Sequence, residues 1–285
     1  VADFEKLLRS LPKPWGVEAN FGVIDARGGA AYYETGNNGF TKFDANDPAV
    51  APFGYLIRTN YSFVGERTED LGLIRYRTAE DLFYMASATH ALSADFIIEQ
   101  VSRCLKHSLT KTDLAENVPS ASGGPSFVSF RDYIPRFSSA SSVVVQGAAS
   151  GESPELATMW TILGFPLCAV AVPVWVKGGA ELPEVLMADG SGTAPLCRMA
   201  MTLKKKCFPI DRESGESYLD LSALLNREGD GILQKIRPFE AGLLKEVGQR
   251  IANWREKGAS PEDLRTTYRR LDEAVRTFYR DHFGL

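Results

Sequence analysis

The chain has few of the residues that usually form a metal or serine-hydrolase site. Among its 285 residues there are three histidines, His90, His107 and His282, and they lie far apart without a His-Glu-x-x-His pattern. Transition metals are bound by His and Cys ligands at characteristic spacings, so the sequence predicts no metal site. A Gly-x-Ser-x-Gly sequence is also missing, so a serine nucleophile with a histidine base is not predicted.

Cysteine is sparse as well. Four cysteines, Cys104, Cys168, Cys197 and Cys207, are widely spaced and form no Cys-x-x-Cys pair. This spacing predicts neither a zinc ribbon nor a disulfide scaffold, and buried free thiols are expected. No phosphate-binding glycine motif follows a predicted strand, so no nucleotide and no other cofactor is expected.

Positive charge and long apolar runs are also limited. The chain has 32 Lys and Arg against 36 Asp and Glu, a net charge of -4, and Lys204–Lys206 is its one strong basic run. Nucleic-acid binding needs a clustered basic surface, so no nucleic-acid partner is predicted. The longest apolar stretch, Leu163–Val176, contains Pro166 and Pro173 and is too short to span a bilayer, so no membrane span is predicted.

The first half of the chain reads as a helix followed by strands. Apolar spacing in residues 1–11 predicts an amphipathic helix that Pro12 ends. Two β runs around a glycine-rich turn, Asn20–Asp25 and Ala30–Glu34, predict a hairpin, and Phe40–Phe43 predicts a further strand.

The segment Phe53–Tyr61 is the most informative part of the sequence. Its apolar run predicts a strand over Tyr55–Asn60 that ends on an amide side chain, where an N–H donor can meet an oxyanion. Arg75 follows at the start of a helical region, and Thr78 is predicted to cap that helix.

In the second half, three nearly continuous apolar runs predict strands covered on both faces, with Pro173 at an edge: Ser141–Gln146, Ala157–Leu163 and Ala169–Trp175. Helices are predicted over Ala194–Cys207 and Leu221–Ile236. Ser260-Pro261 is a strong helix start, and the apolar stripe after it predicts a helix that packs along the body of the protein.

The order sheet, helices, sheet, helices favours an α+β fold. We expect a four-layer α/β/β/α sandwich of antiparallel sheets over residues 1–285 as one domain, with residues 237–285 as its helical cover.

The hairpin Asn20–Glu34, the segment Tyr55–Asn60 and Arg75-Tyr76 together resemble the N-terminal nucleophile hydrolases of the choloylglycine hydrolase, penicillin V acylase and isopenicillin N acyltransferase group. The resemblance runs in order to about Trp175. It implies a hydrolase or acyltransferase that acts on a linear amide bond through a Cys at the start of the mature chain, with the α-amino group of that Cys as base.

This chain starts with Val1 and has no such Cys. The resemblance therefore implies the C-terminal portion of a larger protein, incomplete at its N-terminus and inactive alone. It also implies catalytic roles for Asn60, as donor to the oxyanion, and for Arg75, as cation near the thiolate or the substrate carbonyl. Thr59 and Tyr61 would contact substrate, although some members have His where this chain has Tyr61.

The implied partners are a small-molecule amide and the missing N-terminal segment, or a second chain that supplies it, and a homo-oligomer is compatible with the sequence. A nucleophile exposed by removal of a signal peptide favours a periplasmic or secreted location over a cytoplasmic one. Two alternatives stay open. The chain is a non-catalytic pseudoenzyme or small-molecule-binding domain of the same fold, or it docks on a partner through the aromatic side chains of its last helix, Tyr268, Phe278, Tyr279 and Phe283.

Overall fold

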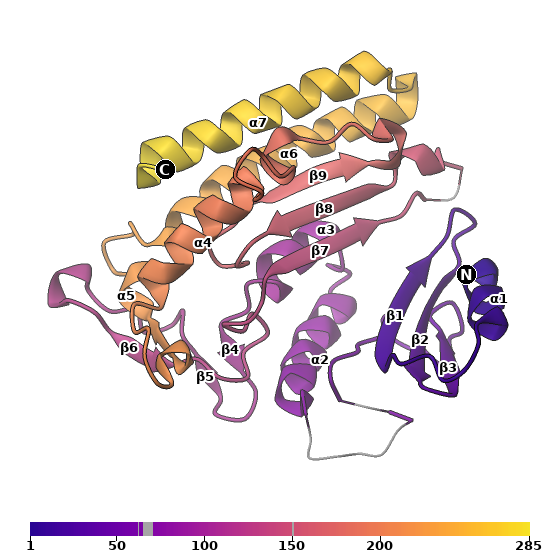
Figure 1. Cartoon of the computed structure of the whole chain (residues 1–285), viewed down its shortest axis with the longest axis horizontal. Coiled ribbons are helices and arrows are strands. Elements are labelled where there is room, and N and C mark those ends of the chain that lie inside the picture. The colour runs from indigo at the N-terminus through magenta and orange to yellow at the C-terminus, as the bar shows by residue number, and fades with distance from the viewer. Residues whose placement is uncertain (62, 65–70, 150) are drawn as a thin grey trace. The chain divides into compact units, whose positions relative to one another are not determined.

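The computed structural model describes residues 1–61, 63–64, 71–149 and 151–285 (Figure 1). Contacts group the chain into two compact units. The first unit holds Val1–Leu92 and Gly147–Pro154, and the second holds Ser93–Gln146 and Glu155–Leu285. The single domain predicted for residues 1–285 stays a prediction beside this division, and each unit is described by itself.

In its described residues the first unit contains one three-stranded antiparallel sheet and two α-helices. The strand order is β1-β2-β3, and Asn20 of β1 faces Glu34 of β2. The elements are α1 (Ala2–Ser10), β1 (Ala19–Ile24), β2 (Ala30–Gly36), β3 (Gly39–Asp44) and α2 (Leu73–Ala88). The predicted first helix, hairpin and third strand are therefore confirmed.

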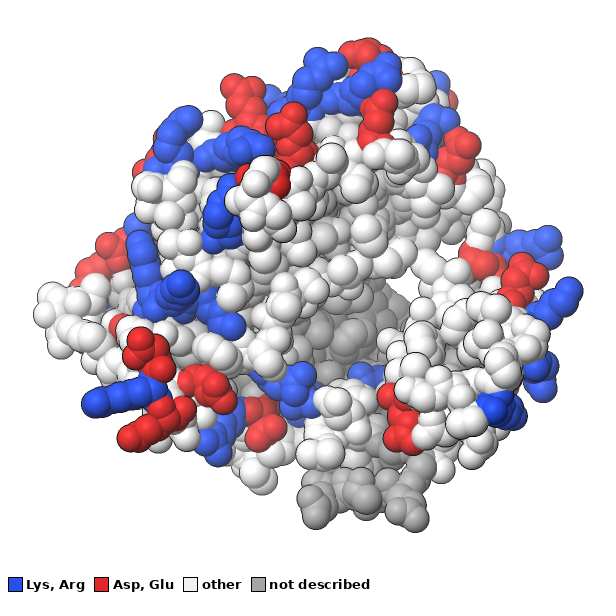
Figure 2. Space-filling model, in the orientation of Figure 1, with Lys and Arg blue, Asp and Glu red and all other residues white. Residues whose placement is uncertain are grey.

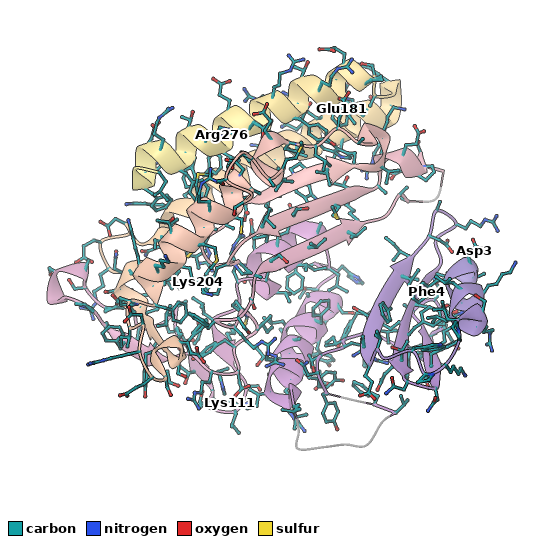
Figure 3. The ribbon with its side chains drawn as sticks, viewed as in Figure 1. Asp3, Phe4, Lys111, Glu181, Lys204 and Arg276 are labelled. Atoms are coloured by element: carbon teal, nitrogen blue, oxygen red, sulfur yellow. The ribbon has the colours of Figure 1, made fainter. Side chains whose placement is uncertain are left out.

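Helix α1 packs on this sheet through a small aromatic core. The ring of Phe4 lies 5.1 Å from that of Tyr33 and 5.7 Å from that of Phe21, and Tyr33 is fully buried. Figure 3 shows Phe4 directed from α1 toward the strands. Aromatic pairs at these separations stabilise the packing by more than their buried area alone would give. The apolar side of α1 therefore packs on the sheet, as expected for the amphipathic helix predicted over residues 1–11.

The predicted strand over Tyr55–Asn60 is wrong. Tyr55–Arg58 adopt no regular structure, and Thr59 and Asn60 lie in a bend. The polar backbone groups of this segment are bonded by side chains instead of a neighbouring strand: Asn20 Nδ2 donates to the carbonyl of Thr59, and Arg58 Nη1 donates to that of Ile57. The backbone N–H and C=O groups of an apolar segment need hydrogen-bond partners, but side chains can supply them in place of a neighbouring strand.

The predicted capping role of Thr78 is also wrong. Helix α2 begins at Leu73, five residues earlier, after Gly72 in a left-handed conformation. Thr78 is buried within the helix, and its hydroxyl donates to the carbonyl of Ile74, one turn earlier. Arg75 accordingly lies in the first turn of α2.

The second unit is built from three antiparallel sheets and five α-helices, with several short 3-10 or π-helical turns between them. Its strands are β4 (Lys106–His107), β5 (Thr112–Asp113), β6 (Phe127–Ser129), β7 (Ser141–Gln146), β8 (Thr158–Leu163), β9 (Ala171–Trp175) and β10 (Tyr218–Asp220). Its α-helices are α3 (Ala94–Phe96), α4 (Pro195–Cys207), α5 (Leu221–Leu224), α6 (Ile232–Lys257) and α7 (Pro261–Phe283), and the π-helical turn η1 (Ile97–Val101) continues α3.

The sheet β7-β8-β9 confirms three predicted strands and the place of Pro173 on an edge strand. The expectation that both faces are covered holds for β9, whose five residues are all buried, and is wrong for β7. Val143 and Val145 are 49% and 54% exposed, and Met159, beside Val145, is 39% exposed. The face that carries Val143, Val145 and Met159 is therefore covered only over β9, whereas Val144 and Trp160 on the opposite face are buried.

Helices α6 and α7 cover the other face. Trp175 at the end of β9 stacks on Tyr268 of α7 and meets Trp254 of α6 edge-on, with ring centroids 5.5 and 5.0 Å apart. Ser260 caps α7 in a reciprocal pair of hydrogen bonds with Asp263, as the sequence predicts. The predicted helix Leu221–Ile236 is wrong in its middle, because Asn226 and its neighbours form a turn between α5 and α6.

The outer side of α7 carries charges of both signs, which Figure 2 shows intermixed along this face. Arg265, Arg269 and Arg276 form ion pairs there with Glu181, Glu262 and Glu184. The rings of Tyr268, Phe278 and Tyr279 are buried in this chain. They therefore pack within the chain and are not displayed for a partner, which disfavours docking through these side chains.

The fold is thus α+β, with helices and several small antiparallel sheets, while the four-layer sandwich is a finer proposal taken up below. No helix in the described part of the chain is both long and apolar enough to cross a membrane.

A buried ion pair joins three segments of the second unit. The guanidinium of Arg103 is fully buried and donates to both carboxylate oxygens of Glu240 on α6. It also donates to the carbonyls of Pro166 and Ala169 at 3.0 and 2.8 Å, while Glu240 accepts from the backbone N–H of Ala171. The segment after η1, the β8–β9 connection and α6 are therefore bonded to one another.

Replacement of Glu240 by Ala is expected to lower the free energy of unfolding by about 3–5 kcal/mol, because it leaves the Arg103 charge buried without its partner. The double variant Arg103→Met, Glu240→Leu removes both charges and is expected to be markedly more stable than Glu240→Ala. Urea unfolding followed by circular dichroism measures both values. Equal losses in the single and double variants would contradict the pairing.

Candidate functional site

The segment Thr59–Tyr61 is fastened to the residue that precedes α2. The Thr59 hydroxyl donates to the carbonyl of Gly72 at 3.1 Å and accepts from the backbone N–H of Tyr61 at 3.2 Å. Asn20 of β1 donates to the Thr59 carbonyl from the other side, at 3.1 Å. Thr59 therefore ties the sheet, the turn and the start of α2 together.

Asn60 and Arg75 are brought together by this arrangement. Arg75 Nη2 donates to Asn60 Oδ1 at 2.5 Å, and the Asn60 side chain is exposed. A guanidinium carries only donors, so the amide oxygen must face Arg75, and the two N–H donors of Nδ2 point away from it. The hydrogen bond to Arg75 thus leaves the NH2 end of the Asn60 amide, not its oxygen, facing away from Arg75.

Gly72 makes the close approach possible. It has φ +80°, and a Cβ added to it would lie 2.9 Å from both the Asn60 nitrogen and Thr59 Oγ1. Side chains rarely adopt such a backbone conformation, and real Cβ atoms do not approach other atoms so closely. The turn and the helix start therefore need glycine at this position.

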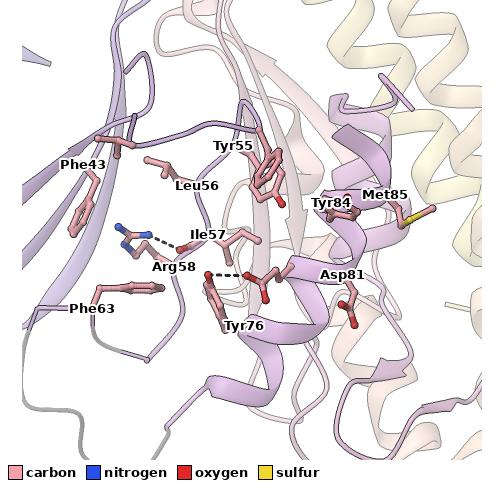
Figure 4. A pocket seen from close by; sticks show the side chains of 13 residues that line it. Phe43, Tyr55, Leu56, Ile57, Arg58, Phe63, Tyr76, Asp81, Tyr84 and Met85 are labelled. Atoms are coloured by element: carbon pink, nitrogen blue, oxygen red, sulfur yellow. Dashed lines mark hydrogen bonds between the residues drawn. The ribbon is translucent and has the colours of Figure 1, made fainter. Parts of the chain in front are cut away.

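Arg58, next to this turn, is buried between two aromatic rings. Its guanidinium carbon lies 4.1 Å from the centroid of Phe43 and 4.4 Å from that of Phe63. Figure 4 shows Arg58 between these two rings. Its side chain is 6% exposed, and burial lowers its pKa. Stacking of a guanidinium on ring faces is favourable when the cation is desolvated, so the two rings account for its burial.

The hydrogen-bonding capacity of Arg58 is only partly used. Nη1 donates to the carbonyl of Ile57 at 2.8 Å, whereas buried Nε has no hydrogen-bond partner in the part of the chain that the structure describes. The carboxylate of Glu34 lies 4.0 Å from Nε, beyond hydrogen-bond distance, and accepts instead from the backbone N–H groups of Phe63 and Val64. Glu34 thus balances the charge of Arg58 without saturating its donors.

A cavity of about 740 Å³ opens beside Arg58 in the first unit. Six rings line it, together with four aliphatic or thioether side chains and three charged ones (Figure 4). The rings are Phe43, Phe53, Tyr55, Phe63, Tyr76 and Tyr84; the apolar chains are Val50, Leu56, Ile57 and Met85; the charged residues are Arg58, Glu80 and Asp81. A predominantly aromatic lining with a few polar groups is typical of small-molecule sites.

Part of this lining is open to solvent. Phe53, Tyr84 and Met85 are 55%, 53% and 61% exposed and lie around the same cavity. Phe53 and Tyr84 pack edge to face, with centroids 5.8 Å apart. Exposed apolar side chains that gather at a cavity mark a binding surface more often than chance exposure does.

Tyr76 links the cavity to the first turns of α2. Its hydroxyl donates to Glu80 Oε1 at 3.4 Å, and its pKa is raised, chiefly by burial. The ring of Tyr76 also lies 6.0 Å from that of Tyr61 and 5.4 Å from that of Phe63. Tyr61 therefore packs among rings that border the cavity.

The four residues predicted for the site thus gather in one place. Asn60 and Arg75 are in direct contact, Thr59 uses its hydroxyl in the turn, and Tyr61 packs on Tyr76. Their catalytic and substrate-binding roles stay predictions. None of the four lines the cavity, which begins at the neighbouring Arg58.

Sequence reasoning missed Arg58, Glu34 and Gly72 as site residues. Glu34 is a buried acid on the face of β2 opposite Ala31 and Tyr33, which form the core with α1. An acid is expected at a position that alternates away from the core, so the strand pattern gave no sign that Glu34 would be buried beside Arg58. In the described residues no group of three or more His, Cys, Asp and Glu side chains could hold a metal ion.

Comparisons with known proteins identify no relative: no family model, no curated protein and no solved structure matches the chain. The resemblance to N-terminal nucleophile hydrolases therefore stays a prediction from the residues quoted for it.

Replacement of Gly72 by Ala is expected to destabilise the first unit by about 2 kcal/mol or more, from positive-φ strain plus the collision with Thr59 and Asn60. Gly54 is a matched control, with φ +75° and no atom within 4 Å of an added Cβ. Gly54→Ala is expected to cost only the strain, about 1 kcal/mol. Urea unfolding compares the two, and equal costs would show that the close approach at Gly72 has no energetic weight.

Proposed function

We propose that the protein is an amide hydrolase or acyltransferase of the N-terminal nucleophile type. The enzyme acts on a linear amide C–N bond through a Cys that lies outside this chain. The observation that carries the proposal is the hydrogen bond from Arg75 Nη2 to Asn60 Oδ1. It supports an exposed side-chain amide that presents N–H donors to a ligand.

Such a donor suits the developing charge of an amide-cleavage reaction. Attack of a thiolate on the amide carbonyl forms the C–S bond and moves an electron pair onto the carbonyl oxygen. An N–H already oriented toward that oxygen stabilises the charge without reorganising in the transition state. The nearby Arg75 cation polarises the Asn60 amide further, since hydrogen bonds in a chain strengthen one another.

The rest of the reaction follows from the same proposal. Collapse of the tetrahedral intermediate breaks the C–N bond, and the amine leaves with a proton from the α-ammonium group of the nucleophilic Cys. The thioester is then cleaved by water in a hydrolase or by a second amine in an acyltransferase. Both outcomes use Asn60 in the same way.

We also propose the four-layer α/β/β/α sandwich for the complete protein. In the second unit, α6 and α7 lie on one face of the sheet β7-β8-β9. The opposite face exposes Val143, Val145 and Met159. A sheet with helices behind and an open apolar face in front suits a second layer of strands.

The second candidate function is a small-molecule-binding domain without catalysis. The aromatic cavity favours it, because its lining needs no nucleophile to bind a ligand. The two functions differ in what the upstream sequence must contain. N-terminal analysis and intact mass of the protein from its natural source decide between them, since the enzyme requires a mature N-terminal Cys on the same or a companion chain.

In the complete enzyme, Asn60→Ala is expected to lower kcat on a linear amide by about 10²-fold or more, as loss of an oxyanion donor does. Asn60→Asp keeps the shape and an oxygen for Arg75 but removes the N–H donors, so it is expected to be equally impaired. A purely structural Asn60 would instead leave Asn60→Asp active. Asn253→Ala, at an exposed position of α6, is the control and should leave kcat unchanged.

A further inference from the structure

The charged side chains around the cavity differ in their exposure and in their hydrogen-bond partners. Glu80 and Asp81 are exposed, and Glu80 accepts a hydrogen bond from the hydroxyl of Tyr76. The side chain of Arg58 is only 6% exposed, and its Nε has no hydrogen-bond partner among the described residues. Nε itself has almost no surface open to the cavity. Arg58 nevertheless lines the cavity, and in the described residues only its Nη1 donates a hydrogen bond, so Nη2 is the donor that an acceptor in the cavity would meet.

The surrounding charge selects the kind of acceptor. Glu34 already lies 4.0 Å from Arg58 Nε, and Glu80 and Asp81 line the same cavity. Glu34 therefore balances the charge of Arg58, and Glu80 and Asp81 add negative charge elsewhere in the lining. A ligand carboxylate at Arg58 would meet repulsion from them in a partly desolvated place, whereas a carbonyl oxygen accepts the same hydrogen bond and carries no net charge.

The body of the ligand is selected by the remaining walls. Phe53, Tyr84 and Met85 expose apolar surface at the cavity, and the rings of Tyr55 and Tyr76 continue it inward. An aromatic or aliphatic group placed there removes apolar surface from water on both sides. The volume of about 740 Å³ leaves room for such a group and a short chain.

We infer that this cavity binds an uncharged ligand with an apolar, preferably aromatic, body and a carbonyl oxygen that accepts a hydrogen bond from Arg58. This inference adds a substrate class to the proposed function. That the bound ligand is a substrate rests on that function. The substrates are then amides whose apolar acyl part carries an uncharged acceptor in addition to the bond that is cleaved. Arg58 is the specificity-determining residue.

The test measures binding to this chain with three probes that share a phenyl ring and a short chain. They are 4-phenylbutan-2-one, which is a ketone, 3-phenylpropanoate, which replaces its methyl group by a charged oxygen, and 3-phenylpropylamine. None contains an amide, so none can be cleaved. Isothermal titration or ligand-observed NMR gives Kd, and the ketone is expected to bind about tenfold more tightly than the carboxylate.

Arg58→Met keeps an unbranched apolar chain and removes the donors. It is expected to weaken ketone binding about tenfold, the usual effect of losing a hydrogen bond from a charged donor. Arg27→Met, in the exposed turn between β1 and β2, is the control and should bind as the original chain does. Circular dichroism of both variants shows whether they fold, and the three-probe comparison on the original chain does not depend on them.

Three results would overturn the inference. Carboxylate binding as tight as that of the ketone would refute the uncharged head group. Tightest binding of the amine would assign recognition to Glu80 and Asp81 instead of Arg58. Absence of saturable binding by every probe at millimolar concentration would refute the site itself. Because no measurement here involves turnover, each of these results leaves the kcat test of Asn60 to decide the proposed function.

Discussion

The second unit depends on the buried guanidinium of Arg103, which needs a carboxylate to balance its charge and carbonyls to accept its remaining hydrogen bonds. Arg103 can be fully buried only because Glu240 and the carbonyls of Pro166 and Ala169 take up its donors. The desolvation of an ion pair is repaid only by such complete hydrogen bonding. The β8–β9 connection therefore cannot move away from α6 without exposing an unpaired charge, and the helical cover is tied to the sheet through this point.

Arg58 in the first unit shows the opposite case. It is also buried, but rings cover its faces, Nε is left without a hydrogen bond, and its nearest carboxylate is 4.0 Å away. One arginine is therefore saturated and structural, and the other keeps unused capacity beside a cavity. We therefore expect Arg103 to contribute to stability and Arg58 to bind a ligand. The two arginines differ in the hydrogen-bond partners that the fold supplies.

The elements predicted correctly are those fixed by local signals. The hairpin follows from its turn and alternation, and α7 follows from the Ser260 cap and its apolar stripe. The segment Tyr55–Asn60 and the start of α2 were predicted wrongly because their partners are distant: Asn20 supplies a backbone bond, and Gly72 provides a close approach that no local pattern encodes. The contact of Asn60 with Arg75 follows the residues singled out from sequence, whereas Arg58, Glu34 and the cavity depend on packing between β2, β3 and residues 53–63.

Three consecutive residues divide the work of the candidate site. Arg58 is buried at the cavity, Thr59 is fixed by its hydroxyl to Gly72, and Asn60 is exposed against Arg75. Two residues of backbone span at most roughly 7 Å, so the backbone positions of Arg58 and Asn60 lie close together on either side of Thr59. Because Thr59 fixes this spacing, the apolar part bound in the cavity would set which carbonyl of a substrate reaches the Asn60 donors. Binding and positioning would then be one property of a single turn.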